Sequence, residues 1–496
     1  MARPGEVHEE PEHEVAIVGT GFAGLCMAIR LLERGERRFV LLERADGVGG
    51  TWRDNHYPGA ACDVPSHLYS LSFAPNAEWS RKFPTQPELR AYLEGVAARY
   101  GLVPHIRFST EMRGAAYDEA NRLWRVETSR GTLTARSLVV AAGGLSEPRL
   151  PDIPGIERFA GKAFHSARWD HGYDLAGKRV AVIGAAASAV QFVPEIAGEV
   201  ARLDVYQRTP NWIVPRPDRA YTGIERWLFR NVPLARRLHR AQIYWSYELR
   251  VLGMVLHPAV MKVYQKVAER HLARQVRDPA LRARLTPNYT IGCKRILISD
   301  DWYPALQKPG VSVITEGIRE IRERSIVTAD GREREVDCIV YATGFYATEN
   351  PIAGLVRGEG GLRLSQAWAE GEEAYLGTLV KGFPNLYFIV GPNTGLGHSS
   401  MVFMIEAQVE FIARLLAHLK SAGAASLAVK PAVQDAFNQR LQARLAGSIW
   451  ATGCQSWYKH RSGKITALWP GFTFDFWLQT ARFDADDYVL GPAAGG

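Results

Sequence analysis

Two glycine-rich turns, 165 residues apart, have the spacing that holds the pyrophosphate of a dinucleotide. The first, Gly19-Thr-Gly21-Phe-Ala-Gly24, follows an apolar run and opens a helical pattern. We expect Gly19 to make the tight turn, Gly21 to let the pyrophosphate approach the backbone, and Gly24 to let helix and strand pack closely. The helix N-terminus adds partial positive charge for the phosphates. Glu43, 24 residues after Gly19, is placed to accept hydrogen bonds from a ribose diol.

The second turn, Gly184-Ala-Ala186-Ala-Ser-Ala189, departs from this pattern because Ala186 stands where the middle glycine is usual. Alanine in the third position is an accepted variant. Arg208 follows the next strand, where an acidic residue would select NAD, and a cation there suits the 2′-phosphate of NADP. The alternative for Arg208 is an ordinary surface cation. The residues expected at this second dinucleotide site are Gly184, Ala185, Ala186, Ala187, Ser188, Ala189, Val190, Gln207 and Arg208.

The elements around both turns form βαβ units, which predicts an α/β fold with two Rossmann-like dinucleotide-binding domains. We expect strands at 14–18 and 38–42 around the first turn, and at 178–183 and 203–206 around the second. Three further apolar runs end in Gly at 138–144, 338–344 and 386–391, where small residues let a ligand approach the backbone.

The predicted domains are discontinuous in sequence. Residues 12–150 and 385–496 would form the first domain, and residues 151–212 and 291–384 the second. Residues 213–290 are helical in pattern, without a strand signal, and would form an inserted helical subdomain.

Three interpretations of the aromatic residues in this insertion stay open: they line a substrate cavity, they pack in a core, or the arginines beside them face a membrane surface. The apolar residues concerned are Trp227, Leu228, Tyr244, Trp245, Tyr247 and Leu252.

Composition excludes several classes of protein. The chain has 496 residues and a net charge of +8, and we attribute this basic balance to an anionic cofactor rather than to nucleic acid. Its five cysteines include no C-x-x-C pair, which argues against a zinc site and a redox-active disulfide and predicts a reducing cytoplasm. The N-terminal 14 residues lack the apolar region of a signal peptide, and Pro and Gly interrupt the longest uncharged stretch, so we expect no integral membrane segment.

The segment between the two turns is the most discriminating. It runs Phe159-Ala-Gly161-Lys-Ala-Phe-His165-Ser-Ala-Arg-Trp169-Asp170 and resembles the fingerprint F-x-G-x-x-x-H-x-x-x-W-P/D of type I Baeyer–Villiger monooxygenases at every fixed position. Flavin monooxygenases that oxidise nitrogen or sulfur usually end this motif in Tyr-Lys. In the family, the histidine organises the linker between the domains. Without the resemblance, His165 would be read as an ordinary loop histidine.

Other segments extend the resemblance over residues 15–476. The stretch 50–63 looks like G-x-W-x4-Y-P-G-x3-D, and Asp337 with 342–345 matches D-x4-A-T-G-F. Residues 292–295 resemble the Lys-Arg pair before the active-site strand, while 391–398 and 456–458 resemble flavin and nicotinamide contacts.

The resemblance implies an enzyme that binds FAD, NADPH and O2 and converts a ketone into an ester or lactone through a C4a-peroxyflavin. Arg295 would stabilise the anionic peroxide and the oxyanion of the adduct, and Asp63 would hold that guanidinium. Without the resemblance, the two residues would be read as an ordinary ion pair. The implied FAD residues are Gly19, Gly21, Gly24, Glu43, Gly50, Thr51, Trp52, Asp63, Tyr69, Met112 and Met401. The implied NADP site gains Ala61, Cys62, Lys294 and Trp457, the last as a cover for the nicotinamide, and no residue is assigned to a metal.

Three alternatives remain. An N- or S-oxidising flavin monooxygenase is disfavoured by Trp169-Asp170 and Arg295, and a dithiol oxidoreductase by the missing C-x-x-C. A non-catalytic nucleotide-binding protein would purify without colour and would not take up FAD. The sequence leaves the ketone and the oligomeric state open.

Overall fold

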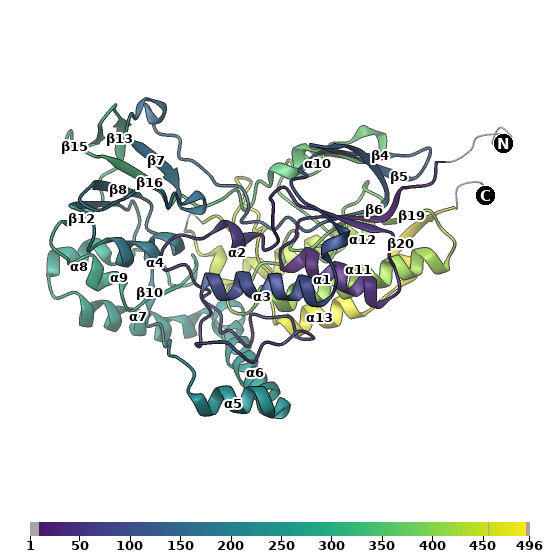
Figure 1. Cartoon of the computed structure of the whole chain (residues 1–496), viewed down its shortest axis with the longest axis horizontal. Helices are drawn as coiled ribbons and strands as arrows, with labels where there is room; N and C mark the ends of the chain where they lie inside the picture. Colours follow the sequence, from purple (N-terminus) through teal and green to yellow (C-terminus); the bar gives the residue numbers. More distant parts are fainter. Residues whose placement is uncertain (1–8, 455, 493–496) are drawn as a thin grey trace.

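The computed structural model describes residues 9–454 and 456–492 and contains two separate parallel-stranded sheets. The first eight residues of the acidic N-terminal stretch, used above in the expectation about a signal peptide, lie outside these ranges. Figure 1 places the sheets at opposite ends of the long axis, with the short helix α2 (Thr51–Asp54) between them.

The first sheet has the order β17-β4-β5-β6-β1-β2-β3, with β18 pairing to β6. Strands β18, β6, β1, β2 and β3 are parallel, whereas β4, β5 and β6 form an antiparallel meander. Helix α1 packs against α11, and α3 also contacts α1. The bounds are β1 His13–Val18, β2 Phe39–Leu42, β3 Ile106–Arg107, β4 Met112–Asp118, β5 Leu123–Thr128, β6 Gly131–Val140, β17 Val356–Arg357, β18 Leu386–Phe388, α1 Phe22–Glu33, α3 Gln86–Arg99 and α11 Met401–Ser421.

The second sheet has the all-parallel order β12-β9-β8-β16-β7. All four residues of β16 are buried, as continuous apolar strands are when both faces of a parallel sheet are covered. The bounds are β7 Lys162–His165, β8 Arg179–Ile183, β9 Arg202–Tyr206, β12 Val311–Ile314, β16 Cys338–Tyr341, α4 Ala187–Ile196 and α9 Trp302–Ala305, with a small antiparallel sheet of β13 Ile318–Ile321, β14 Ser325–Thr328 and β15 Glu333–Glu335.

The remaining elements pack with the first sheet, and together they make up the first half of the molecule. Helix α13 packs along α11, and the pair β19 and β20 closes the C-terminal end. Their bounds are α10 Leu364–Ala367, α12 Pro431–Ala446, α13 Thr473–Ala481, β19 Ser426–Val429 and β20 Tyr488–Gly491.

Packing corrects one predicted boundary. We assigned residues 291–384 to the second domain, but β17 pairs with β4 of the first sheet. Ile352, Trp368 and Phe383 belong to the same apolar core as β4, β5 and β6. The stretch after about residue 350 therefore packs with the first sheet. The sequence did not show this because a strand of two residues carries no periodicity.

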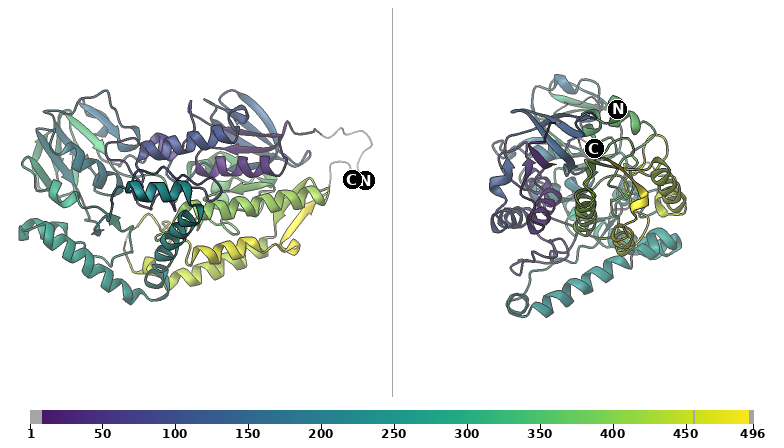
Figure 2. Two further views of the ribbon diagram at one scale, coloured as in Figure 1. Left: turned by 60° about the horizontal axis from the view of Figure 1, so that its bottom comes forward. Right: turned by 90° about the vertical axis from the view of Figure 1, so that its right-hand side faces the viewer.

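The helical insertion begins and ends at a two-strand contact between β10 (Ile213–Val214) and β11 (Leu297–Ile298). Its helices are α5 Gly223–Asn231, α6 Pro233–Glu248, α7 Met261–Gln275 and α8 Pro279–Leu285, with a π-helical turn at Leu252–Leu256. Helix α5 starts with a capping box of Thr222 and Glu225, and Asp278 caps α8. Figure 1 and Figure 2 show these helices on the outside of the molecule.

The six apolar residues of the insertion named above divide into two groups. Tyr247 is buried and Leu228 and Tyr244 are half-buried, whereas Trp227, Trp245 and Leu252 are exposed. Neither core packing nor a cavity wall explains the exposed group.

A buried acid attaches the insertion to the first half of the molecule. The Glu248 carboxylate accepts hydrogen bonds from the backbone N–H and the hydroxyl of Thr473, at 2.8 and 2.9 Å, and lies 3.5 Å from His398 Nε2. Burial opposes ionisation of this carboxyl, but His398 and Thr473 hold its pKa below the ordinary value. Because both side chains are almost fully buried, loss of the Glu248 carboxylate would leave His398 and Thr473 without this polar partner.

No helix within the described ranges has both the length and the apolar character needed to traverse a bilayer. This finding says nothing about contact with a membrane surface.

We predict that Glu248→Ala destabilises the protein, because removing one partner of a buried polar pair costs about 3–5 kcal/mol. Thermal unfolding of the variant, followed by circular dichroism, should show a clear fall in the midpoint. Glu269→Ala, at an exposed position of α7, is the matched control and should unfold like the parent. Equal midpoints for both variants would contradict this role for Glu248.

Candidate active site

The two glycine turns have the same local geometry. Gly19 has φ of +105° and Gly184 has φ of +108°, a region that favours glycine. A Cβ on Gly19 would lie 2.8 Å from the carbonyl oxygen of Ala141, and one on Gly184 would lie 2.3 Å from that of Ala342. In both units, therefore, a small residue at the end of another strand, Ala141 or Ala342, packs directly against the first glycine of the turn.

Gly21 and Gly24 are required for different reasons. A Cβ on Gly24 would lie 1.9 Å from the Gly19 oxygen, so protein packing alone demands glycine there. A Cβ on Gly21 would find Gly50 Cα at 3.8 Å as its nearest protein neighbour. Protein atoms leave room for a side chain at Gly21, which is the space that a pyrophosphate would use, so the turn fits a dinucleotide.

Glu43 lies buried beside the first turn with its carboxylate engaged by protein donors. It accepts hydrogen bonds from the N–H and hydroxyl of Thr20, at 3.1 and 2.6 Å, and from the N–H of Ala45 at 3.0 Å. Arg53 Nη1 lies 2.9 Å from its other side. These contacts fix the carboxylate at the end of β2, and a ribose diol would have to share it with Thr20 and Arg53.

The other predicted FAD residues come from several elements. Gly50 faces the first turn, and Trp52 Nε1 donates to the Tyr69 hydroxyl at 3.3 Å. The Tyr69 ring packs edge-on against Phe22 of α1, 5.3 Å between centroids. Thr51 begins α2, Met112 begins β4 and Met401 begins α11. The structure thus brings Gly50, Trp52 and Tyr69 to α1, whereas Met112 packs in the apolar core of β4, β5 and β6.

Arg295 and Asp63 form an ion pair, with Nη2 and Oδ2 2.5 Å apart. The two side chains keep 42% and 28% of their surface exposed. The neighbouring Asp63 charge holds the pKa of Arg295 above its ordinary value, and burial raises the pKa of the adjacent Tyr458 and Cys62. Arg295 is therefore a permanent cation with an open side, held in place by a carboxylate.

Lys294 and Arg208 form a second cationic group. Lys294 Nζ lies 4.9 Å from the centre of the Tyr289 ring, and its pKa is lowered by burial and by the nearby Arg208 charge. Two cations that repel each other are the arrangement expected of an anion site. Gln207, by contrast, is buried and donates to the Arg284 carbonyl at 3.2 Å, so its side chain supports the loop.

The loop carrying Asp63 is clamped to α4 of the second sheet. Gln191 donates to the Ala61 carbonyl at 2.9 Å and accepts from the Tyr57 hydroxyl at 2.9 Å. Helix α4 begins at Ala187 after Ala186, so the predicted second pyrophosphate site lies on the helix that holds this loop. Ala189 and Val190 are buried, and Ala185 packs in the same core.

The fingerprint segment lies where the chain crosses between the two sheets. His165 accepts a hydrogen bond from the Ala167 N–H at 3.1 Å, and its ring meets Phe345 edge-on. Burial lowers the pKa of His165 to about 4, so the ring is neutral at neutral pH. Trp169 packs between Phe164 and Phe192.

The other fingerprint positions have local contacts. A Cβ on Gly161 would lie 2.6 Å from the Phe159 ring, and Asp170 pairs with Lys162. We read these contacts as structural support for the crossing.

A disulfide joins the loop that carries Lys294 and Arg295 to a C-terminal loop. Cys293, next to Lys294, is bonded to Cys454, 161 residues away, with Cα atoms 6.2 Å apart. The expectation of reduced cysteines is therefore wrong for this pair, because a bond between distant cysteines leaves no local spacing pattern. Trp457 follows in the same loop, exposed and packed on Tyr458 at 4.4 Å between ring centres.

Comparisons with known proteins identify the family. A family model described as pyridine nucleotide-disulphide oxidoreductase matches residues 16–228. A Baeyer–Villiger monooxygenase of Streptomyces coelicolor is 51% identical over 99% of this chain and 95% of its own length. One from Pseudomonas aeruginosa is 52% identical over 96% of this chain and 91% of its own length. This chain belongs to the Baeyer–Villiger monooxygenases.

The structure of another protein, OTEMO in complex with FAD and NADP, superposes with a TM-score of 0.89 at 27% identity, covering 97% of this chain and all of that one. The expected α/β fold with two dinucleotide-binding domains is confirmed, and so are FAD and NADP as cofactors. As a Baeyer–Villiger monooxygenase, the chain is an oxidoreductase that uses O2 as cosubstrate.

Sequence reasoning missed two residues that support the arrangement of this monooxygenase: Gln191 and Glu248. Glu248 had a readable signal, since it is a lone acid in the aromatic run Tyr244-Trp-Ser-Tyr-Glu248. Gln191 had none, because its partner Ala61 lies 130 residues away.

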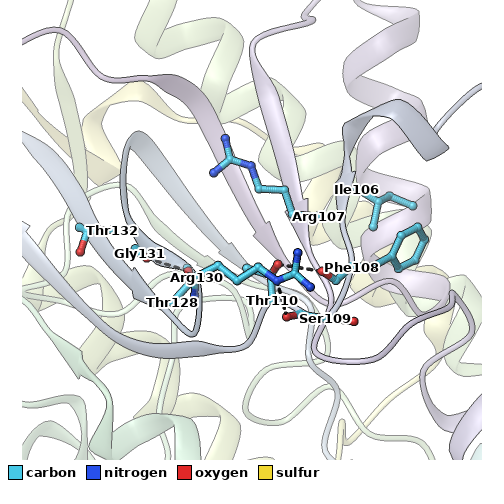
Figure 3. Close-up of a pocket in the computed structure, with 9 residues that line it drawn as sticks. All are labelled: Ile106, Arg107, Phe108, Ser109, Thr110, Thr128, Arg130, Gly131 and Thr132. Atoms are coloured by element: carbon cyan, nitrogen blue, oxygen red, sulfur yellow. Dashed lines mark hydrogen bonds between the residues drawn. The ribbon is translucent and has the colours of Figure 1, made fainter.

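A pocket of about 450 Å³ opens at the edge of the first sheet (Figure 3). Two of its lining residues, Arg107 and Thr110, are backbone hydrogen-bonded to Glu43. Arg130 crosses it and donates to the Ser109 carbonyl at 3.1 Å, while Arg107 pairs with Glu12 at 2.6 Å. Both cations are already engaged, and we assign the pocket no ligand. In the described ranges, His, Cys, Asp and Glu form no group of three or more suited to a metal ion.

We predict that Gly21→Ala weakens FAD binding while the fold persists, because the added methyl occupies ligand space. Overpacking by one methyl costs about 1–3 kcal/mol, roughly tenfold to a hundredfold in affinity. The measurement is flavin content after purification and the affinity of the apoprotein for FAD. Gly24→Ala is the contrasting variant and should lose stability itself. A Gly21→Ala protein with parental FAD affinity would remove this turn from the FAD site.

We also predict that Arg208→Ala raises the Michaelis constant for NADPH by about tenfold to a hundredfold, the value of a charge-assisted contact, and leaves that for NADH unchanged. Steady-state oxidation of both coenzymes measures the effect. Arg319→Ala, an exposed arginine on β13 of the small antiparallel sheet, is the control. Equal changes for NADPH and NADH would show that Arg208 does not contact the 2′-phosphate.

Proposed function

We propose that this chain oxidises a small ketone to an ester or lactone, with Arg295 as the catalytic cation and Asp63 as the residue that positions it. The observation that carries the proposal is the Arg295–Asp63 ion pair on a loop clamped to α4, between the two dinucleotide turns. FAD and NADPH, when bound, supply the reducing equivalents and the activation of O2.

Arg295 supplies the positive charge for this chemistry. A guanidinium stays protonated at any working pH, so it can face an oxyanion without changing its own charge. Its pairing with Asp63 keeps one edge of the planar group occupied, which leaves the other edge to donate to substrate oxygen. Preorganised donors of this kind are effective because they need no rearrangement during the reaction.

Coenzyme choice rests on the cations next to Arg295. Lys294 and Arg208 repel each other, and the 2′-phosphate of NADPH would neutralise both. Trp457 is the candidate cover for the nicotinamide, since its exposed ring follows the loop tied to Cys293. One loop, 292–295, would thus serve both the coenzyme and the reacting oxygen.

Exclusion of water falls to the inner side of the insertion. Tyr247 is buried near Asp63, and Arg250 stacks over its ring at 3.8 Å from the centroid. These residues would wall off the ion pair from solvent, which protects a reactive oxygen species from premature protonation.

A cytoplasmic location is a further part of the proposal. It is supported by the demand for NADPH and is tested by cell fractionation.

We predict that Arg295→Ala retains FAD but forms ester at a rate about a hundredfold to a thousandfold lower, the effect of losing one oxyanion donor. NADPH that is still consumed should yield H2O2. Arg295→Lys should restore activity only in part, because an ammonium lacks the planar fork. Oxygen uptake, H2O2 and ester are quantified together on one ketone.

Arg208→Ala at saturating NADPH is the control and should keep ester and NADPH consumption coupled. Ester formation by Arg295→Ala near the parental rate would refute the catalytic role. Oxidation of an amine or thioether, with no ester from any ketone, would instead favour the N- or S-oxidising alternative.

A further inference from the structure

Exposed apolar side chains are concentrated in the helical insertion. Of the 22 large apolar residues that are exposed in the described part of the chain, eleven lie between Ile224 and Val267. Single exposed apolar residues are ordinary on protein surfaces, but a concentrated group marks an interaction surface. The insertion therefore offers a surface that the rest of the protein does not cover.

On α6 these residues share one face. Leu234, Leu238, Trp245 and Leu249 follow one another at four, seven and four residues, a helical spacing, and are 64%, 62%, 55% and 60% exposed. Ile243 and Tyr247, on the opposite side of the helix, are buried. Helix α6 is therefore apolar toward solvent as well as toward the protein.

Neighbouring elements extend this face. Ile224 and Trp227 add to it from α5, which contacts α6. Trp245 contacts Phe474, at the start of α13, which also exposes Trp477 and Leu478. The spacing of three and four continues after α6 through Leu252, Leu256, Val260, Val263 and Val267. In Figure 1 and Figure 2 these helices lie at the outside of the molecule.

Positive charge is concentrated in the same segment. Residues 213–290 contain fifteen Lys and Arg against five Asp and Glu, a net charge of +10, while the other residues together carry −2. Exposed cations directly precede exposed apolar residues along the helices: Arg226 before Trp227, Arg237 before Leu238, Lys262 before Val263 and Lys266 before Val267. Adjacent residues lie about 100° apart around a helix, so these cations flank the apolar face.

Acidic residues do little to offset these charges. In α5, α6 and α7, all of them fully described, Glu225 is bound by Arg219, Glu248 is buried, and Glu269 alone is exposed. An open groove of about 490 Å³ lies at Val267, the last exposed apolar residue of this series. Arg270 and Arg274 also line it. It combines an apolar wall with two cations, as a phosphorylated headgroup would require.

We propose that the outer face of α5, α6 and α7 docks on the surface of an anionic phospholipid bilayer. Trp and Leu side chains on a helix lying in the interface bury apolar area, and flanking Lys and Arg bind acidic headgroups. A second copy of the chain is the poorer partner, because it would bring a net charge of +10 against another +10. This proposal does not depend on which substrate the enzyme oxidises.

The test is flotation of the purified FAD-loaded enzyme with vesicles of pure phosphatidylcholine, or of phosphatidylcholine mixed with phosphatidylglycerol. We expect binding to the mixed vesicles, much weaker binding to the neutral ones, and a loss of binding as salt screens the charges. No binding to the mixed vesicles at low salt would overturn the proposal.

Variants separate the two contributions. The triple variant Leu234→Ser, Leu238→Ser and Leu249→Ser should bind mixed vesicles at least tenfold more weakly, since about 1.5–3 kcal/mol accompanies full burial of each leucine. Arg226→Gln, Arg237→Gln and Lys266→Gln should each cost about fivefold, the equivalent of roughly 1 kcal/mol per cation. All six positions are exposed, so the fold should persist.

The matched control is Val103→Ser, Leu150→Ser and Val489→Ser, three similarly exposed apolar residues outside the insertion. It should bind vesicles like the parent. Equal binding by the leucine variant and this control would overturn the proposal. A dimer by light scattering that the leucine variant abolishes, with no vesicle binding by the parent, would identify a second copy as the occupant instead.

Discussion

The ion pair between Arg295 and Asp63 is the interaction on which the arrangement of the site depends. Its side chains are partly exposed, and pairs of that kind contribute only about 0–1 kcal/mol to stability. Its importance is geometric, because it joins a loop of the first half of the molecule to the segment that follows the insertion. Gln191 of α4 anchors the loop that carries Asp63, and the disulfide of Cys293 anchors the loop that carries Arg295.

The helical insertion has an inner face that packs against the rest of the protein and an outer face that is exposed. Its inner side is fixed to the site by Glu248 and by Met254, which lies near Gly397 in the loop before His398. Its outer side exposes leucine and tryptophan at the same helical period. A single helix, α6, therefore connects the surroundings of Asp63 with the proposed membrane-binding surface.

The sequence predicted the parts of this protein that depend on local rules. Both turns could be predicted because glycines such as Gly19 and Gly24 satisfy constraints set within a few residues. The buried strands could be predicted because parallel sheets require continuous apolar runs. The pairing of Arg295 with Asp63 came from family resemblance, since nothing local links residues 232 positions apart.

The pairing of β17, the disulfide and the Gln191 clamp were not predictable, because each depends on a long-range contact without a sequence pattern. The exposure of Trp227 and Trp245 was left open for a different reason. An apolar helical pattern fits a core, a cavity wall or a surface contact, and only the tertiary structure shows which side chains remain uncovered.

The crossings between the two sheets have a mechanical consequence. Arg149 N–H donates to the Gly344 carbonyl at 2.9 Å, and Tyr346 N–H donates to that of Glu147 at 3.1 Å. The segments that leave and re-enter the first half of the molecule thus run antiparallel and are hydrogen-bonded to each other. Hydrogen bonds between two antiparallel segments resist their sliding along each other, so the linkage between the two sheets is stiffer than two separate segments would be. His165 packs edge-on against Phe345 of the returning segment, so the size of its side chain bears directly on this linkage.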